Sequence, residues 1–131
     1  MHLPDDLMLL LNDSNVEKKL VTLATNGTTN VRSIKALHAP EPTVIVLAQI
    51  DAQLNGELLA YLSHGGLVSI LCVSTKGEQL AAYQILCSVR EFQTSGPLFD
   101  KFLDELRVRS IDLEGVWALE PVDIVDGVKQ S

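Results

Sequence analysis

The stretch "REFQTSGPLFDKFLDEL", residues 90–106, joins two kinds of structure within one short segment. Its first residues continue an apolar, strand-like run, which ends at the sequence "TSGP" over 94–97. Pro97 suits the first position of a helix, where its missing N–H leaves no hydrogen bond unmade. Apolar residues then recur at the spacing of one helix face: Leu98, Phe99, Phe102, Leu103 and Leu106. The stretch therefore predicts a strand that leads directly into an amphipathic helix.

Most of the remaining chain has the composition of β-strands. β-Branched and other apolar residues fill six segments: 18–25, 29–37, 43–48, 67–74, 79–92 and 115–125. Between the first two segments lies Asn26-Gly27, and both residues tolerate the positive φ angles of a tight hairpin turn. A loop fixed by two prolines is expected over 38–42, and Pro121 interrupts the closing segment. The long segment 79–92 is expected to be bent or bulged.

Two further short helices are expected. One covers residues 4–11, where a proline and two aspartates favour a helix start. The other covers 55–66: Asn55 can cap its start, and Gly65 can end it in the left-handed conformation. The apolar stripe of this second helix is predicted to consist of Leu58, Leu59 and Leu62.

These elements predict a mainly β (α+β) fold. About six strands form one mostly antiparallel sheet system, with two or three short helices. Such a sheet hides its edges best by closing into a barrel, and the late helix then covers a barrel mouth or an edge. The 131 residues fit one domain over 1–131, which is long enough for a hydrophobic core.

Charge and cysteine content restrict the partners and the compartment. The net charge of −7 argues against nucleic acid or an anionic membrane as the main partner, because phosphate groups attract basic surfaces. The start "MHLPDDLMLLL" lacks the basic region of a secretion signal, and no apolar run is as long as a membrane span. Cys72 and Cys87 are interpreted as buried thiols, with a disulfide or redox pair as the alternative. A cytoplasmic protein is expected.

Several chemistries find no support in the residue spacing. The histidines His2, His38 and His64 do not have the spacing of metal ligands. No nucleophile–base motif, dinucleotide fingerprint or convincing carboxylate pair is visible. The sequence therefore gives no candidate catalytic residue.

The order of the elements resembles the pyridoxamine 5'-phosphate oxidase-like, FMN-binding split-barrel family, and in particular its small FMN-binding proteins. The most specific match is "REFQTSGPLFDKF" over 90–102, which resembles the strand-to-helix junction of that family. The other matching segments are "LATNGTTNVRSIKAL" over 23–37, "ELLAYLSHGGLVSILCV" over 57–73 and "VWALEPVDIVDG" over 116–127. The resemblance covers roughly residues 6 to 127, so it concerns nearly the whole chain.

The resemblance implies a tight homodimer with FMN at the dimer interface. The function implied is that of a flavin-dependent oxidoreductase or electron carrier, in which the cofactor performs the redox chemistry. By position, Arg32 and Ser33 match the phosphate-binding residues of the second strand, and Lys35 matches a further basic position. Gln49 lies where the family approaches the flavin.

At the start of the middle helix the chain departs from the family pattern. Asn55-Gly56 stand near the place where the family usually has Lys or Arg with Ser or Thr. Free N–H groups at a helix start can bind a phosphate without a lysine, and Gly56 would allow close approach. The alternative is that Asn55 simply caps the helix. Trp117 is a candidate for stacking on the flavin, with sealing of the dimer interface or core packing as alternatives.

Strand geometry limits how the two basic residues can act together. Side chains alternate along a strand, so Arg32 and Lys35 face opposite ways. Arg32 shares its face with Ile34 and Ala36 and is a candidate for phosphate contact or for an ion pair at the surface or dimer interface. Lys35 is expected on a solvated face. The second class of function is a cofactor-free, haem-binding or deazaflavin-binding split-barrel dimer that acts as a binding or regulatory module.

Overall fold

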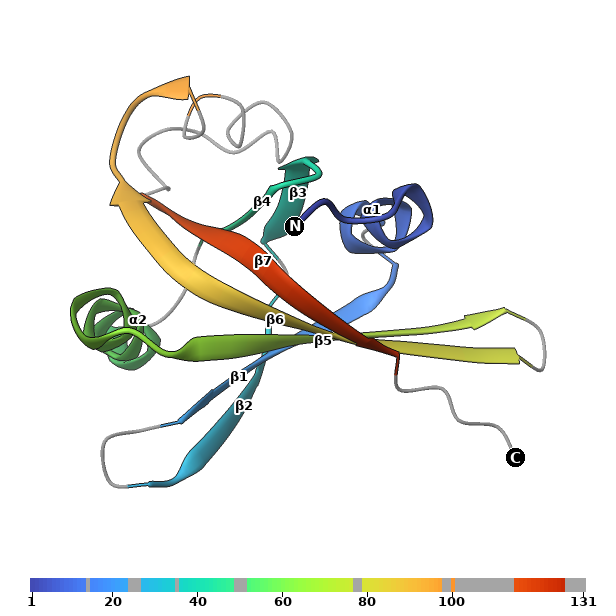
Figure 1. Ribbon diagram of the computed structural model, residues 1–131, viewed down its shortest axis with the longest axis horizontal. Coiled ribbons are helices and arrows are strands. Elements are labelled where there is room, and N and C mark those ends of the chain that lie inside the picture. Colours follow the sequence, from blue (N-terminus) through green and yellow to red (C-terminus); the bar gives the residue numbers. More distant parts are fainter. Residues whose placement is uncertain are drawn as a thin grey trace.

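The computed structural model describes residues 1–13, 15–23, 27–34, 36–48, 52–76, 79–97, 100 and 115–126. This part of the chain is mainly β, as predicted, with seven strands and two helices (Figure 1). In chain order the elements are α1 (Asp5–Asn12), β1 (Glu17–Leu23), β2 (Thr29–Ser33), β3 (Leu37–Glu41), β4 (Val44–Ala48), α2 (Ala52–His64), β5 (Leu67–Lys76), β6 (Gln79–Gln93) and β7 (Val116–Asp126).

All strands belong to one antiparallel sheet with the order β2-β1-β5-β6-β7-β4-β3. β2 and β3 follow one another in the chain but lie at the two ends of this order. The link between them bonds to the strands next to both ends: the Ile34 N–H donates to the Lys18 carbonyl of β1 at 2.9 Å, and the Ala48 N–H of β4 donates to the Ala36 carbonyl at 3.0 Å. The two ends of the sheet are thereby drawn together into the predicted split barrel.

The strand count corrects the prediction of six. The expected loop over 38–42 is largely β3, which pairs with β4. Pro40 is tolerated there because β3 lies at the end of the sheet order, where a missing N–H breaks no inner ladder. The register shifts between His38 and Glu41, around the proline. The two prolines concealed a strand because prolines are normally typical of loops.

The irregularity predicted for the long strand β6 is confirmed, and β7 forms the predicted closing strand. β6 is irregular as predicted, with register shifts against β7 between Leu86 and Cys87 and between Val89 and Glu91. β7 is one strand despite Pro121. Its pairing with β4 involves only residues 116–119, so the proline lies beyond that ladder and at a register shift with β6. A bulge is one of the places where a strand accepts proline.

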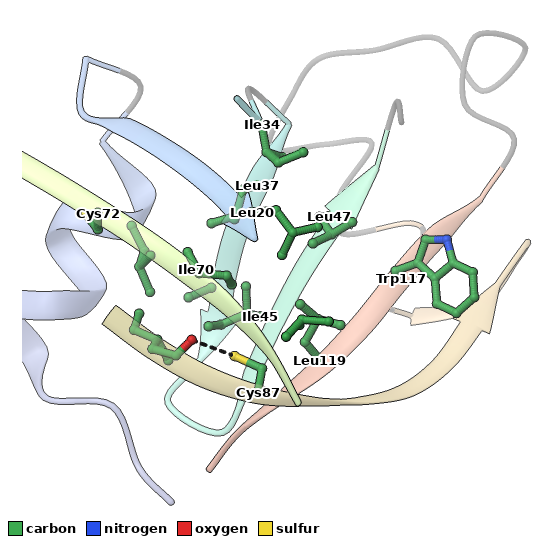
Figure 2. Packing of buried hydrophobic residues seen from close by; sticks show 14 of the residues in the cluster. Leu20, Ile34, Leu37, Ile45, Leu47, Ile70, Cys72, Cys87, Trp117 and Leu119 are labelled. Carbon is green, nitrogen blue, oxygen red and sulfur yellow. Dashed lines mark hydrogen bonds between the residues drawn. The ribbon is translucent and has the colours of Figure 1, made fainter. Parts of the chain in front are cut away.

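The interior of the barrel is filled by aliphatic side chains from most of the strands. Leu20, Ile45, Leu47, Ile70 and Leu119 are each at most 1% exposed and point into one core (Figure 2). Cys72 and Cys87 are free and buried, which confirms their interpretation as buried thiols. Burial raises the pKa of Cys87 to about 12, so this thiol stays protonated and acts as a packing group.

The two helices lie at different ends of the sheet (Figure 1). α2 ends as predicted: Gly65 has φ 85° and its N–H donates to the Tyr61 carbonyl at 2.8 Å. Its start is corrected, since it begins at Ala52 and not at Asn55. The predicted stripe is corrected too. Leu54 and Leu58 are buried, whereas Leu59 and Leu62 are 46% and 39% exposed. The earlier start brings Leu54 into the helix and defines which face is buried.

Of the helix predicted after Pro97, residues 97 and 100 are described and are helical. The Asp100 N–H donates to the Gly96 carbonyl at 2.9 Å. The predicted apolar stripe of this helix lies entirely outside the described residues. Within the part of the chain that is described, no helix is long and apolar enough to span a membrane.

Gly115 and Gly56 give a matched pair of substitutions. A Cβ at residue 115 would lie 2.8 Å from the Gln93 carbonyl oxygen and closer still to the Phe92 ring, whereas a Cβ at residue 56 meets nothing within 4 Å. We expect Gly115→Ala to lower the free energy of unfolding by about 1–3 kcal/mol through overpacking. Gly56→Ala is expected to raise it by about 0.4–1 kcal/mol, because alanine favours the helix. Urea denaturation measures the free energy of unfolding of both variants. Equal changes in the two variants would contradict the close packing at Gly115.

Candidate functional site

A group of polar side chains lies between α2 and the β1–β2 hairpin. The Glu57 carboxylate accepts hydrogen bonds from the Thr22 hydroxyl, from the Asn30 amide at 3.4 Å to each oxygen, and from the Arg32 guanidinium. Arg32 Nη2 lies 3.1 Å from Glu57 Oε2 and Nη1 lies 3.5 Å from Oε1. We call Thr22, Asn30, Arg32 and Glu57 the Glu57 cluster. Donors from two strands thus converge on one carboxylate from a helix.

The register of the hairpin explains why these donors meet. Thr22 pairs with Asn30, and the buried Leu20 pairs with Arg32. Because side chains alternate along a strand, all of them lie on the core-facing side of the hairpin. The inner face of β2 is therefore polar, while Val31 on its outer face is 55% exposed. This is the reverse of the usual pattern for a half-buried strand.

α2 presents Glu57 to these donors. Leu54, Glu57, Leu58 and Tyr61 follow one another at spacings of three, one and three residues, which places them along one face of the helix. Leu54 and Leu58 are buried. The Tyr61 hydroxyl accepts a hydrogen bond from the Leu23 N–H at 2.8 Å and donates to the Leu23 carbonyl at 3.5 Å. α2 is therefore held on the hairpin at two polar points, Glu57 and Tyr61.

The cluster is mostly shielded from water. The Arg32 and Glu57 side chains are 18% and 12% exposed, and Thr22 is 2% exposed. Desolvation by burial raises the pKa of Glu57, but hydrogen bonds from Thr22, Arg32 and Asn30 and the charge of Arg32 outweigh it. The net result is a pKa below the ordinary value of 4.5, so Glu57 is ionised at neutral pH. Its charge balances that of Arg32.

Some of the predicted site residues belong to this cluster and some do not. Arg32 is within it and forms an ion pair, the alternative to phosphate contact, although the partner is Glu57 of the same chain. Ser33 points to the other face of the hairpin, where it is exposed and its hydroxyl lies 3.5 Å from Glu17 Oε1. Lys35 and Gln49 lie outside the described residues.

The structure places Asn55 and Gly56, the expected phosphate cradle, inside α2 and not at its start. Because α2 begins at Ala52, these residues are in its second turn, where N–H groups bond to carbonyls four residues earlier. Asn55 is therefore not a cap. Its Oδ1 accepts a hydrogen bond from Trp117 Nε1 at 2.9 Å. The sequence predicted a helix start at Asn55 because asparagine is a preferred N-cap residue. Its hydrogen bond to Trp117 is a tertiary contact that the local sequence does not reveal.

Trp117 is a core residue. It is 1% exposed, and its ring packs against Phe92 with centroids 4.9 Å apart. Figure 2 shows its side chain at the edge of the core, with Leu119 from the same strand inside. Of the three predicted roles, the contacts within the chain support packing.

The residues of the site that the sequence analysis did not identify are Thr22, Asn30 and Glu57. The sequence feature that could have identified them is the row of polar residues at alternate, inward-facing positions of the β1–β2 hairpin.

The donor set of the cluster fits an anionic group. A guanidinium, a hydroxyl and a carboxamide are the groups that bind phosphate or carboxylate in proteins, and charge-assisted hydrogen bonds are the stronger ones. Here the anion in place is the protein's own Glu57. The FMN phosphate implied by the resemblance would therefore have suitable donors at Thr22, Asn30 and Arg32.

Among the described residues, no group of three His, Cys, Asp or Glu side chains is arranged to hold a metal ion.

The sequence matches no family model and no curated protein. The fold does match solved structures. An FMN-binding protein from Syntrophomonas wolfei is similar over 95% of this chain and 85% of its own, with 17% identity and a TM-score of 0.75. A putative pyridoxamine 5'-phosphate oxidase from Lactobacillus delbrueckii is similar over 95% and 93%, with 15% identity and a TM-score of 0.67.

A third similar structure is HutZ, described as the heme storage protein from Vibrio cholerae. It is similar over 96% of this chain and 95% of its own, with 14% identity and a TM-score of 0.63. Such low identities establish the fold and not the ligand. The protein has the pyridoxamine 5'-phosphate oxidase-like split-barrel fold that the order of its elements predicted.

The ion pair between Arg32 and Glu57 makes the free energy of unfolding decrease at acid pH. Because the pKa of Glu57 is lowered on folding, its ionisation stabilises the protein above about pH 4.5, and this stabilisation is lost as the pH falls through the folded-state pKa. We expect Glu57→Gln to lower the free energy of unfolding by about 1–3 kcal/mol at pH 7. The difference from wild type should shrink below pH 4.5. Urea denaturation across pH measures it, and a constant difference would contradict the ion pair.

Proposed function

We propose that the protein binds a flavin, with FMN as the form that the resemblance implies, and acts as a flavin-dependent oxidoreductase or electron carrier. The split-barrel fold shared with an FMN-binding protein over 95% of the chain supports this proposal. The observation that carries it is the convergence of Thr22, Asn30 and Arg32 on one anion, Glu57. A bound flavin supplies hydride or electron transfer, while the protein provides binding and orientation.

In this proposal the donors of the Glu57 cluster, Thr22, Asn30 and Arg32, hold the anionic tail of the flavin in place of the Glu57 carboxylate. Arg32 supplies charge and two N–H donors, and Thr22 and Asn30 add neutral donors. Ser33, Lys35 and Gln49 are proposed to contact the cofactor, as the resemblance implies. Asn55 and Trp117 hold one another through a hydrogen bond at 2.9 Å, and their proposed role is to fix α2 against β7. The proposed location is the cytoplasm.

We also propose that the protein works as a homodimer. The outer face of the sheet carries Val31, Val21 and Leu86 in one row, with Ser69 between Val21 and Leu86, and Leu71 and Val125 in the next row, with Gln84 between them. Val31 and Val125 are 55% and 44% exposed. An antiparallel sheet face that stays in water is normally polar, so exposed apolar side chains on this face favour burial against a second copy.

A second candidate is a haem-binding, deazaflavin-binding or cofactor-free split barrel that serves as a binding or regulatory module. The similarity to HutZ favours haem within this class. The neutralisation of Arg32 by Glu57 favours a ligand without a phosphate dianion. The absorbance spectrum of the purified protein separates these candidates, because flavin and haem absorb at different wavelengths.

Flavin binding is tested by titrating FMN and following the quenching of its fluorescence. We expect saturable quenching, and we expect Arg32→Ala to weaken it roughly tenfold, which is the contribution of one charge-assisted hydrogen bond. Lys19→Ala is the matched control, since it removes one positive charge from the neighbouring strand outside the cluster. The absence of saturable binding would reject the flavin, and equal effects of the two variants would reject the role of Arg32.

The homodimer is tested by the mass in solution, from light scattering during gel filtration. We expect Leu71→Glu to convert a dimer into a monomer, because a buried unpaired carboxylate opposes association. Leu9→Glu is the control, because Leu9 lies on α1 and is already 73% exposed. A monomeric wild type, or a dimer that survives the Leu71 substitution, would contradict the proposed face.

A further inference from the structure

The Glu57 cluster has the form of an anion-binding site that the protein fills with its own carboxylate. Hydroxyl, amide and guanidinium donors from β1 and β2 all point at the two oxygens of Glu57. Glu57 itself comes from α2. The donors and the anion therefore belong to different elements of the fold.

The backbone positions of the donors are fixed independently of Glu57. Thr22 and Asn30 are paired across the ladder, as are Leu20 and Arg32, so the strand backbones fix their spacing. Leu20 is 1% exposed and anchors this part of the hairpin in the core. Removing the Glu57 charge would leave the three donors in place, with the positive charge of Arg32 among them.

The position of α2 does not depend on Glu57 alone. α2 has independent anchors in the buried Leu54 and Leu58 and in the hydrogen bonds of Tyr61 to Leu23. The Glu57 side chain is 12% exposed, so rotation of its bonds can carry the carboxylate toward water while the helix stays in place. A ligand anion can thus take the place of the carboxylate when the Glu57 side chain rotates away.

We infer that Glu57 is the specificity-determining residue of this site, which disfavours a flavin with a terminal phosphate relative to the same flavin without one. A phosphate dianion has to displace the carboxylate or lie beside it, and like charges repel strongly when they are partly desolvated. A flavin that ends in a hydroxyl can donate to Glu57 instead. The inference rests on the proposed function for the identity of the ligand, but the competition at Arg32 is a property of the chain alone.

The first test uses inorganic phosphate and the thermal unfolding midpoint of the full chain, at constant ionic strength balanced with chloride. We expect phosphate to raise the midpoint of Glu57→Gln, which frees the donors, and to leave wild type unchanged. Glu17→Gln is the matched control: it makes the same change of charge on the same hairpin, beside Ser33 and Lys19 and outside the cluster. Adding Arg32→Gln to Glu57→Gln should abolish the effect.

The second test compares riboflavin with FMN, which differs from it by the phosphate. Wild type should bind FMN no more tightly than riboflavin, and Glu57→Gln should shift the preference toward FMN by roughly tenfold or more. Circular dichroism checks that Glu57→Gln is folded. If it is not, Glu57→Asp, whose shorter side chain draws the carboxylate away from Arg32, replaces it in both tests.

The outcomes separate the two ideas. Phosphate that stabilises Glu57→Gln, together with no binding of either flavin, supports the competition and rejects the proposed function. Flavins that bind wild type and variant with the same preference support the proposed function and overturn the inference. A folded Glu57→Gln protein that phosphate does not stabilise overturns the inference regardless of flavin binding.

Discussion

The whole arrangement depends on the short connection that leads directly from one edge strand of the sheet to the other. Ile34 and Ala36 lie between β2 and β3, and their backbones bond to β1 and β4, the strands next to the two edges. A sheet of this order has two edges that need protection from other chains. Since the two edge strands are consecutive in the chain, the end of β2 and the start of β3 lie within a few residues of one another, and the aliphatic interior of Figure 2 is enclosed between the edge strands.

This closure decides where polar residues can be placed. The β1–β2 hairpin extends past the core, and the inward positions at its far end face α2 and not the aliphatic interior. Buried polar groups are stable only when they are hydrogen-bonded. Glu57 satisfies three of them at once, and Tyr61 satisfies the backbone of Leu23 at the end of β1. The contact between α2 and the hairpin is therefore polar, although the helix is anchored by leucines.

The sequence predicted those features that depend on local chemistry. Gly27 has φ 86° and Gly65 has φ 85°, as a hairpin turn and a helix end require, and the irregularity of β6 followed from its length. The features it did not predict depend on tertiary contacts. Pro40 is tolerated in a strand because that strand is at an edge, and Asn55 lies inside a helix, where its carboxamide accepts a hydrogen bond from Trp117. The Glu57 cluster joins residues far apart in the chain, so its only local sign was the inverted polarity of β2.

The cluster also shows why the likeness to flavin-binding structures does not fix the ligand. The fold brings Arg32 of β2 close to α2, which is held in place by its buried leucines and by Tyr61. What the position can bind then depends on which residue the helix presents. With Glu57 there, the charge of Arg32 is already balanced inside the protein, and its pairing stabilises the contact between helix and hairpin. An anionic ligand must therefore replace a structural interaction as well as make its own, so affinity at this position and stability of the barrel oppose one another.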